Sequence, residues 1–185
     1  MDFVFFNAAD EVWIPQAQVE DTVREYGYKG RLTVVENGID LAMENLDSIL
    51  DFKAESRRRI GIDRSEMLLL FVGQHIWEKG VEVIIRAISM LRDFPVKMAF
   101  IGTGYAVDDM KSLIRSLGVE DRVTLHGVIR DRDTLKQYYA AASLFLFPSF
   151  YDNAPLVVRE AAMMGTPSIL LHGATAAEVI VDGKN

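Results

Sequence analysis

Residues 67–102 read MLLLFVGQHIWEKGVEVIIRAISMLRDFPVKMAFIG, and the fold class can be inferred from the order of apolar and amphipathic segments within them. An apolar run of strand length, MLLLFVG at 67–73, is followed by an amphipathic stretch at about 79–92 and by a second apolar run, KMAFIG at 97–102. The amphipathic stretch carries apolar side chains at helical spacing, namely Val81, Ile84, Ile85, Ile88 and Leu91. The pattern predicts two parallel strands joined by a helix that covers their sheet.

The same alternation continues along the rest of the chain. Further strands are expected at 123–127, 143–148 and 167–171, and further helices at about 106–117, 131–142, 156–164 and from 174 onward. Because the connections are only a few residues long, these repeats predict a Rossmann-like, doubly wound parallel α/β sheet. In such a sheet the ligand lies outside the carboxyl ends of the strands.

The first 60 residues fit this repeat less well. EVWIP at 11–15 and LTVVENGID at 32–40 predict strands on either side of a short helix, and a charged helix then ends at Arg59. We interpret residues 1–40 as the end of an amino-terminal domain with an inter-domain linker, and residues 41–185 as the Rossmann-like domain. Since VIVDGKN stops at a turn signature, we expect that domain to be truncated at its carboxyl end.

Composition narrows the class of function. The 185 residues carry 20 Lys and Arg against 27 Asp and Glu, a net charge of −7, so a nucleic-acid partner is not expected. There is no cysteine, and the three histidines are far apart, so no metal site is predicted. No apolar run reaches about 18 residues and no signal peptide opens the chain, which indicates a cytoplasmic protein without a transmembrane segment.

Two glycine-containing stretches follow the first two strands. In FVGQHIWEKG (71–80) a strand leads into a helix start, where free backbone N–H groups and Lys79 would suit a phosphate; alternatively, Lys79 is only a favourable residue for a first turn. In IGTGYAV (101–107), Gly102 and Gly104 match part of the dinucleotide fingerprint, but Val107 occupies the third glycine position. An NAD site is therefore disfavoured. Either these glycines permit a tight turn, or they form part of the cleft wall for a different ligand.

FPSFYDNAPLVVREAAMMG (147–165) is the richest candidate. Pro155 suits a helix start, Asp152 lies in the loop before it and Glu160 lies inside the helix. Both carboxylates could face one cleft and accept hydrogen bonds from sugar or ribose hydroxyls. Alternatively, Asp152 or Asn153 caps the helix and Glu160 forms a solvated ion pair. In LHGVIRD (125–131), the loop backbone could hydrogen-bond a planar base.

Together these stretches resemble the carboxy-terminal half of GT-B glycosyltransferases, specifically the retaining family four, also called group 1. VVENGID resembles the inter-domain segment, FVGQHIWEKG the phosphate loop, and FPSFYDNAPLVVREAAMMGTPSIL the donor motif, while GATAAEVIVDGKN is also typical. The resemblance implies a nucleoside-diphosphate sugar held between two Rossmann-like domains, with this domain supplying most of the donor site and no metal or other cofactor.

The resemblance also implies residue roles. Lys79, beside Gly73 and Gln74, would contact the diphosphate, and Gly102 and Gly104 would lie near the donor. The loop at Val128 and Ile129 would receive the base through its backbone. Asp152 would hold the sugar and Glu160 the ribose, while the segment Asn153, Ala154, Pro155, Leu156 and Val157 would turn into the helix start that cradles phosphate.

This chain departs from the family pattern at three places. Asp152 replaces the first of two glutamates, Asn153 to Pro155 replace a glycine–aromatic–glycine turn, and Gln74 replaces an arginine that normally joins the lysine. The last exchange substitutes a neutral hydrogen bond for a charge-assisted one about twice as strong.

The implied reaction is sugar transfer to an acceptor hydroxyl with retention at the anomeric carbon, with Lys79, Asp152 and Glu160 as the active-site side chains. The acceptor site would lie in the amino-terminal domain, so these 185 residues alone should be inactive, and the full-length enzyme could be peripheral to a membrane. Two alternatives stay open: a noncatalytic Rossmann-like module for assembly or regulation, and a GT-B sugar-nucleotide epimerase.

Overall fold

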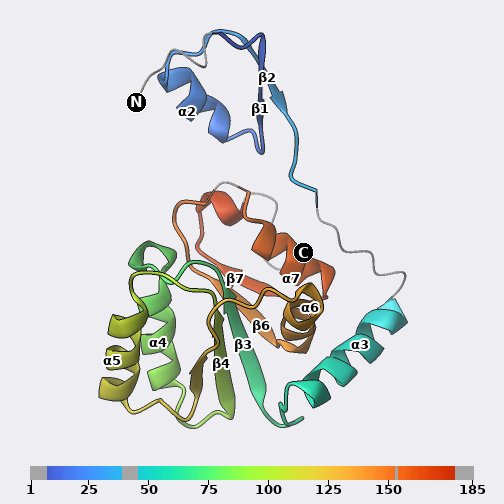
Figure 1. Cartoon of the computed structure of the whole chain (residues 1–185), viewed down its shortest axis with the longest axis vertical. Helices are drawn as coiled ribbons and strands as arrows, with labels where there is room; N and C mark the ends of the chain where they lie inside the picture. The colour runs from blue at the N-terminus through green and yellow to red at the C-terminus, as the bar shows by residue number, and fades with distance from the viewer. Residues whose placement is uncertain (1–7, 39–45, 153, 178–185) are drawn as a thin grey trace.

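The computed structural model describes residues 8–38, 46–152 and 154–177. Over these residues the chain forms two units (Figure 1). The larger unit is built on a five-stranded sheet in the order β5-β4-β3-β6-β7, and the smaller unit holds a two-stranded sheet. All strand pairs in both sheets are parallel.

The elements of the larger unit follow the predicted alternation. Its strands are β3 (Met67–Val72), β4 (Val96–Ile101), β5 (Val123–Leu125), β6 (Leu144–Phe147) and β7 (Ser168–Leu170). Its helices are α3 (Leu46–Arg59), α4 (Val81–Met90), α5 (Val107–Leu117), α6 (Arg132–Ala141) and α7 (Leu156–Met163), with 3₁₀ turns η1 (Trp77–Lys79) and η2 (Thr175–Ala177). The prediction of a Rossmann-like parallel α/β fold is confirmed.

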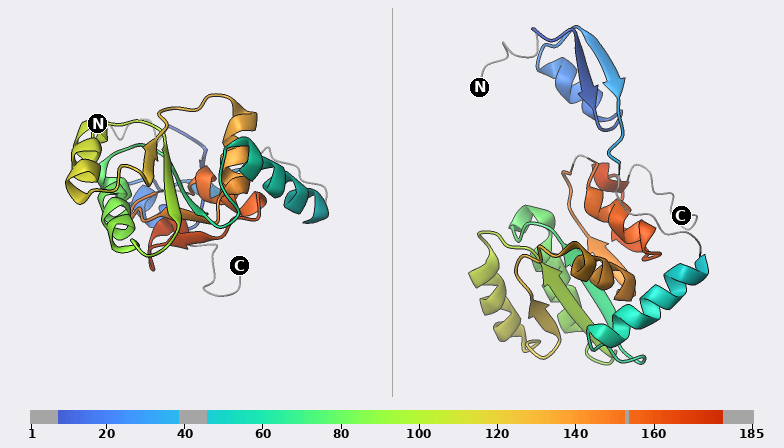
Figure 2. Two further views of the ribbon diagram at one scale, coloured as in Figure 1. Left: turned by 90° about the horizontal axis from the view of Figure 1, so that it is seen from below. Right: turned by 45° about the vertical axis from the view of Figure 1, so that its right-hand side comes forward.

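The helices form a layer on each side of the sheet. Helices α4 and α5 cover one face, and α3, α6 and α7 cover the other (Figures 1 and 2). The change of face follows from right-handed crossovers, because the chain runs outward from β3 to β5 and then returns past β3 to β6 and β7. Apolar side chains of the central strands, such as Leu70, Phe71, Phe100 and Phe145, are fully buried between the layers.

The predicted helix at about 79–92 is shorter than expected. Its apolar face is confirmed, because Val81, Ile84, Ile85 and Ile88 are buried against the sheet. Gly80, however, has φ of +73°, a left-handed conformation that interrupts the helical hydrogen-bond pattern, so Lys79 belongs to η1 and α4 begins only at Val81.

The smaller unit consists of β1 (Glu11–Ile14), α2 (Val19–Glu25) and β2 (Arg31–Val34). Its own small core contains Ile14, Val23 and Tyr28. It stands next to the start of α7 in the larger unit (Figure 1). None of the helices in the described ranges combines the length and apolar character that crossing a bilayer requires.

Candidate functional site

A cavity of about 260 Å³ opens at the carboxyl ends of β3 and β6. Residues from the loop after β3 and the loop after β6 line it: Val72, Gly73, Gln74, Lys79, Phe147, Asp152, Pro155, Leu156 and Val157. The two sequence motifs proposed for phosphate and sugar, which are far apart along the chain, therefore meet at one place. The pairing of β3 with β6 brings them together.

Lys79 and Asp152 face each other in this cavity. The Lys79 Nζ atom lies 2.5 Å from Asp152 Oδ2, and the two side chains are only 17% and 23% exposed. Lys79 Nζ also donates to the carbonyl of Tyr151 at 3.4 Å and lies 5.9 Å from the centroid of the Phe147 ring. Asp152 does not cap α7, because the capping position is held by Pro155 and no side chain bonds there.

The start of α7 forms one wall of the cavity. Pro155 precedes the helix, and the backbone N–H groups of Leu156 and Val157 come before the first hydrogen bonds of the helical ladder. Free N–H groups at a helix start, aligned with the helix dipole, favour an anion. One ammonium and one helix start therefore share the same small space.

Thr175 holds the backbone of Asp152, a role that sequence reasoning missed. The Thr175 hydroxyl accepts from the Asp152 N–H at 3.1 Å and donates to the Asp152 carbonyl at 2.7 Å. The only signal in the sequence was the family-like segment GATAAEVIVDGKN, which singled out no particular residue.

Gly102 and Gly104 do not line the cavity. A Cβ atom on Gly102 would lie 1.9 Å from the Gly73 carbonyl oxygen, and one on Gly104 would lie 2.3 Å from the carbonyl oxygen of His75. The His75 N–H donates to Thr103 and the His75 carbonyl accepts from Ala106, both at 3.0 Å. These glycines therefore let the loop after β4 pack against the loop after β3, which places them behind the cavity wall.

Tyr105 ties the same two loops together at the surface. Its hydroxyl donates to Glu78 Oε2 at 2.5 Å and accepts from the Trp77 N–H at 3.3 Å. This hydrogen bond lowers the pKa of Glu78 and raises the pKa of Tyr105. The loop after β4, through Tyr105, thus holds the turn that carries Lys79.

Glu160 lies outside the cavity, contrary to the expectation that it shares one cleft with Asp152. Helix α7 turns it toward α6, where its carboxylate accepts from Arg132 at 2.9 Å and from the Tyr139 hydroxyl at 2.7 Å. Only 6% of Glu160 is exposed, whereas the Arg132 side chain is 58% exposed, so the ion pair has one buried and one solvated partner. Burial, followed by the charge of Glu160, raises the pKa of Tyr139.

The remaining predicted residues fall at different places. Val128 is exposed in the loop between β5 and α6, and Ile129 packs partly against the core. Asn153 lies outside the described residues. Ala154 is buried and faces the smaller unit instead of the cavity.

The fold and this cavity define a Rossmann-like α/β domain with an anion-favouring site at the carboxyl edge of its sheet. Residues 52–185 match the profile of the family described as glycosyl transferases group 1. The chain belongs to this family.

Relatives and solved structures agree with this assignment. The chain is 32% identical over 151 residues to an uncharacterized glycosyltransferase of Methanocaldococcus jannaschii, covering 81% of this chain and 38% of that protein. It is 28% identical over 172 residues to the alpha-monoglucosyldiacylglycerol synthase of Streptococcus pneumoniae, covering 91% and 38%. This chain therefore spans well under half the length of these two relatives.

Two structures illustrate the shared fold. Sucrose-phosphate synthase from Thermosynechococcus elongatus superposes with a TM-score of 0.76 at 26% identity, covering 91% of this chain and 42% of that one. Anabaena HepE, solved in complex with UDP and glucose, gives a TM-score of 0.78 at 20% identity, covering 95% and 48%.

Proposed function

We propose that this chain contains the donor-binding domain of a retaining glycosyltransferase that moves a sugar from a nucleoside-diphosphate sugar to an acceptor hydroxyl. The observation that carries the proposal is the convergence of Lys79, Asp152 and the start of α7 on one cavity. The UDP complex of the HepE structure supports the choice of ligand class.

In this proposal the diphosphate lies against Lys79 and the N–H groups of Leu156 and Val157. Lys79 then exchanges part of its interaction with Asp152 for the phosphate oxygens, and Asp152 accepts hydrogen bonds from hydroxyls of the transferred sugar. The base lies along the backbone of the loop at Val128 and Ile129. The ribose lies toward Glu160. The ion-pair partner of Glu160 is Arg132, the first residue of α6, which directly follows this loop.

The reaction breaks the bond between the anomeric carbon and the diphosphate oxygen, the acceptor oxygen forms a new bond to the same carbon on the same face, and the proton of the acceptor hydroxyl passes to the leaving diphosphate. Negative charge develops on the leaving diphosphate as this bond breaks. Lys79 and the helix start stabilise that charge, and one such preorganised donor is typically worth about 3 to 4 kcal/mol when it is removed. The positive groups of the chain itself serve this step, so chelation of divalent metal with EDTA should not change donor binding.

In this proposal the acceptor site lies in the amino-terminal domain of the longer protein. Residues 1–40 are the last part of that domain. These 185 residues alone should bind donor without turning it over. The full-length enzyme would work in the cytoplasm, either free or at a membrane surface.

The test is ligand-dependent stabilisation. UDP, GDP or ADP, at 100 times its dissociation constant, should stabilise the native state by about 2.7 kcal/mol, which raises the Tm of a domain of this size by about 5–10 °C. Lys79→Ala should weaken binding at least about tenfold, because it removes a charge-assisted contact. Lys111→Ala is the control, since it also removes a lysine from an ion pair, but one that is exposed on the surface of α5 with Asp108.

A noncatalytic module remains the second candidate, because Gln74 leaves Lys79 as the one cationic side chain among the described residues that line the cavity. Absence of a Tm shift with all three nucleotides at millimolar concentration would refute donor binding. Sugar transfer or donor hydrolysis by the full-length protein would instead exclude the noncatalytic module.

A further inference from the structure

Ala154 has an unusual backbone conformation for a residue with a side chain. Its φ is +45°, and among the described residues it is the one non-glycine with a positive φ. This left-handed region is disfavoured for L-residues because Cβ approaches the following carbonyl oxygen. Neighbouring groups must therefore hold Ala154 in place.

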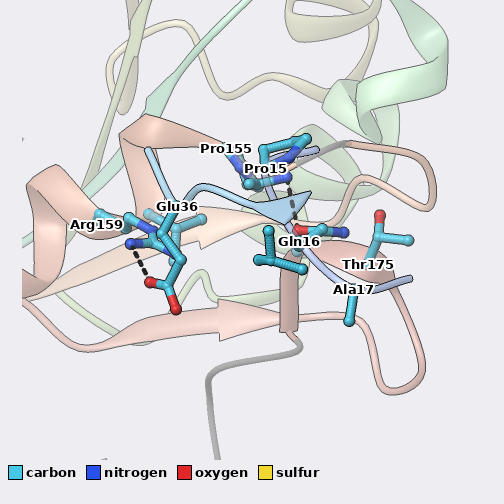
Figure 3. A pocket seen from close by; sticks show the side chains of 11 residues that line it. Pro15, Gln16, Ala17, Glu36, Pro155, Arg159 and Thr175 are labelled. Carbon is cyan, nitrogen blue, oxygen red and sulfur yellow. Dashed lines mark hydrogen bonds and ion pairs between the residues drawn. The ribbon is translucent and has the colours of Figure 1, made fainter. Parts of the chain in front are cut away.

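Two side chains from the amino-terminal part of the chain hold its peptide groups. The Ala154 N–H donates to Gln16 Oε1 at 2.9 Å, and the Ala154 carbonyl accepts from Asn37 Nδ2 at 3.2 Å. Gln16 follows β1 and Asn37 follows β2, so each strand of the smaller sheet supplies one of the contacts. Figure 3 shows Gln16 reaching this position beside Pro155.

The orientation of the Gln16 side chain leaves one of its polar atoms unsatisfied. It is only 7% exposed, and its Nε2 atom is buried with no hydrogen-bond partner in the part of the chain that the structure describes. A buried N–H without a partner is unfavourable, so the orientation is explained by what the other end of the amide does. The oxygen satisfies Ala154, whose own N–H would otherwise be buried and unpaired.

A second contact fixes the two units beside this point. Arg159 of α7 donates to Glu36 Oε2 at 3.1 Å (Figure 3). Arg159 also donates to the Asn37 carbonyl at 3.2 Å. The segment after β2 is therefore fastened to the helix whose start lines the cavity. Gln16 and Asn37 therefore contact the backbone of Ala154 while Arg159 links α7 to the segment that carries Asn37.

We propose that Gln16 and Asn37 are positioning residues for the donor site. They hold Ala154 in its left-handed conformation, and Ala154 lies between Asp152, which faces Lys79, and Leu156, which begins α7. The amino-terminal unit thus sets the geometry of two cavity walls without contacting the ligand itself. The identity of the ligand in this inference rests on the proposed function. The contacts that hold Ala154 are independent of that function.

The first experiment compares Gln16→Met with Gln18→Met in the 185-residue chain. Methionine preserves length and apolar packing but removes the acceptor, and Gln18 is an exposed glutamine two residues away. Hydrogen exchange measured by NMR should show the Ala154 amide exchanging at least about tenfold faster in Gln16→Met and unchanged in Gln18→Met. Asn37→Ala, at a half-buried position, should also accelerate amide exchange in this loop. This variant replaces Gln16→Met in the experiment if Gln16→Met does not fold.

The second experiment is a rescue. Gln16→Met should weaken binding of the best of UDP, GDP and ADP by about tenfold, and adding Ala154→Gly should restore the affinity to within about threefold, because glycine adopts positive φ without the Cβ penalty. A glutamine that only supports packing of the smaller unit would lower stability without being rescued at residue 154.

The outcomes separate the two proposals. If the wild-type chain binds none of the three nucleotides, the donor-site function fails, while the exchange measurement still tests the positioning role. If Ala154 exchanges at the same rate in wild type and Gln16→Met, or if Ala154→Gly restores no affinity, the positioning role is refuted even where the nucleotide binds.

Discussion

The ammonium group of Lys79 lies 2.5 Å from the carboxylate of Asp152 although the two residues are 73 positions apart in sequence. The pair occupies the space in which the proposed diphosphate needs a cation. In the proposed function Asp152 would compete with phosphate for Lys79 and would also bind the transferred sugar. This double role makes the pair the most informative place to alter the cavity.

Asp152→Asn should tighten binding of the free nucleoside diphosphate by about two- to fivefold, because breaking a partly exposed ion pair costs no more than about 1 kcal/mol and frees Lys79 for phosphate. The preference for the nucleotide sugar over the nucleotide should fall in the same variant. Calorimetric titrations in low and high salt measure both effects. Asp108→Asn, which breaks the surface pair with Lys111, is the control and should change neither.

Gly104→Ala should destabilise the chain by about 1–3 kcal/mol, since the new methyl group would overlap the His75 carbonyl and force two loops apart. Urea unfolding gives the change in free energy. Gly38→Ala is the control, because a Cβ there meets nothing within 4 Å, and it should stay within about 0.5 kcal/mol of wild type. Equal stability of the two variants would contradict the packing role of Gly104.

Tyr139→Phe should lower the free energy of unfolding by about 1–3 kcal/mol, because it takes one hydrogen bond from the buried carboxylate of Glu160. Tyr138→Phe is the matched control. Its hydroxyl lies 3.4 Å from His126 Nδ1 near the surface, so the change should be small. A loss of nucleotide affinity in Tyr139→Phe beyond the loss in Tyr138→Phe would support the proposal that the ribose binds near Glu160.

His75 should make the chain less stable in mild acid. Its ring is 1% exposed beside Phe71 and Phe100, and burial lowers its pKa below the ordinary value of 6.5. The unfolded chain then binds the proton more readily, so stability is complete above about pH 6.5 and falls as the pH drops toward the folded-state pKa.

His75→Phe should therefore flatten the dependence of Tm on pH between about 5 and 7. His126, whose pKa burial also lowers, would account for what dependence remains. A profile that is equally steep in His75→Phe would show that another group is responsible.

Hydrophobic periodicity predicted the larger unit well because each strand and helix buries one continuous apolar pattern. The motifs around Lys79 and Asp152 could be paired because parallel strands deliver their carboxyl ends to one edge. The direction of Glu160 could not be predicted, since it depends on Arg132 and Tyr139, which approach from another helix. The roles of Thr175 and Gln16 could not be predicted either, because both side chains bond to backbone groups, and every residue type carries such groups.

The contacts between His75, Thr103 and Ala106 run from backbone to backbone. Such bonds survive exchange of most side chains, so the loop that carries Gln74 keeps its shape when residue 74 changes. Gln74→Arg should therefore place a guanidinium in the cavity wall without changing the backbone of the loop. The shape of this cavity wall is therefore set by backbone contacts, while its chemical character is set by the side chain at position 74.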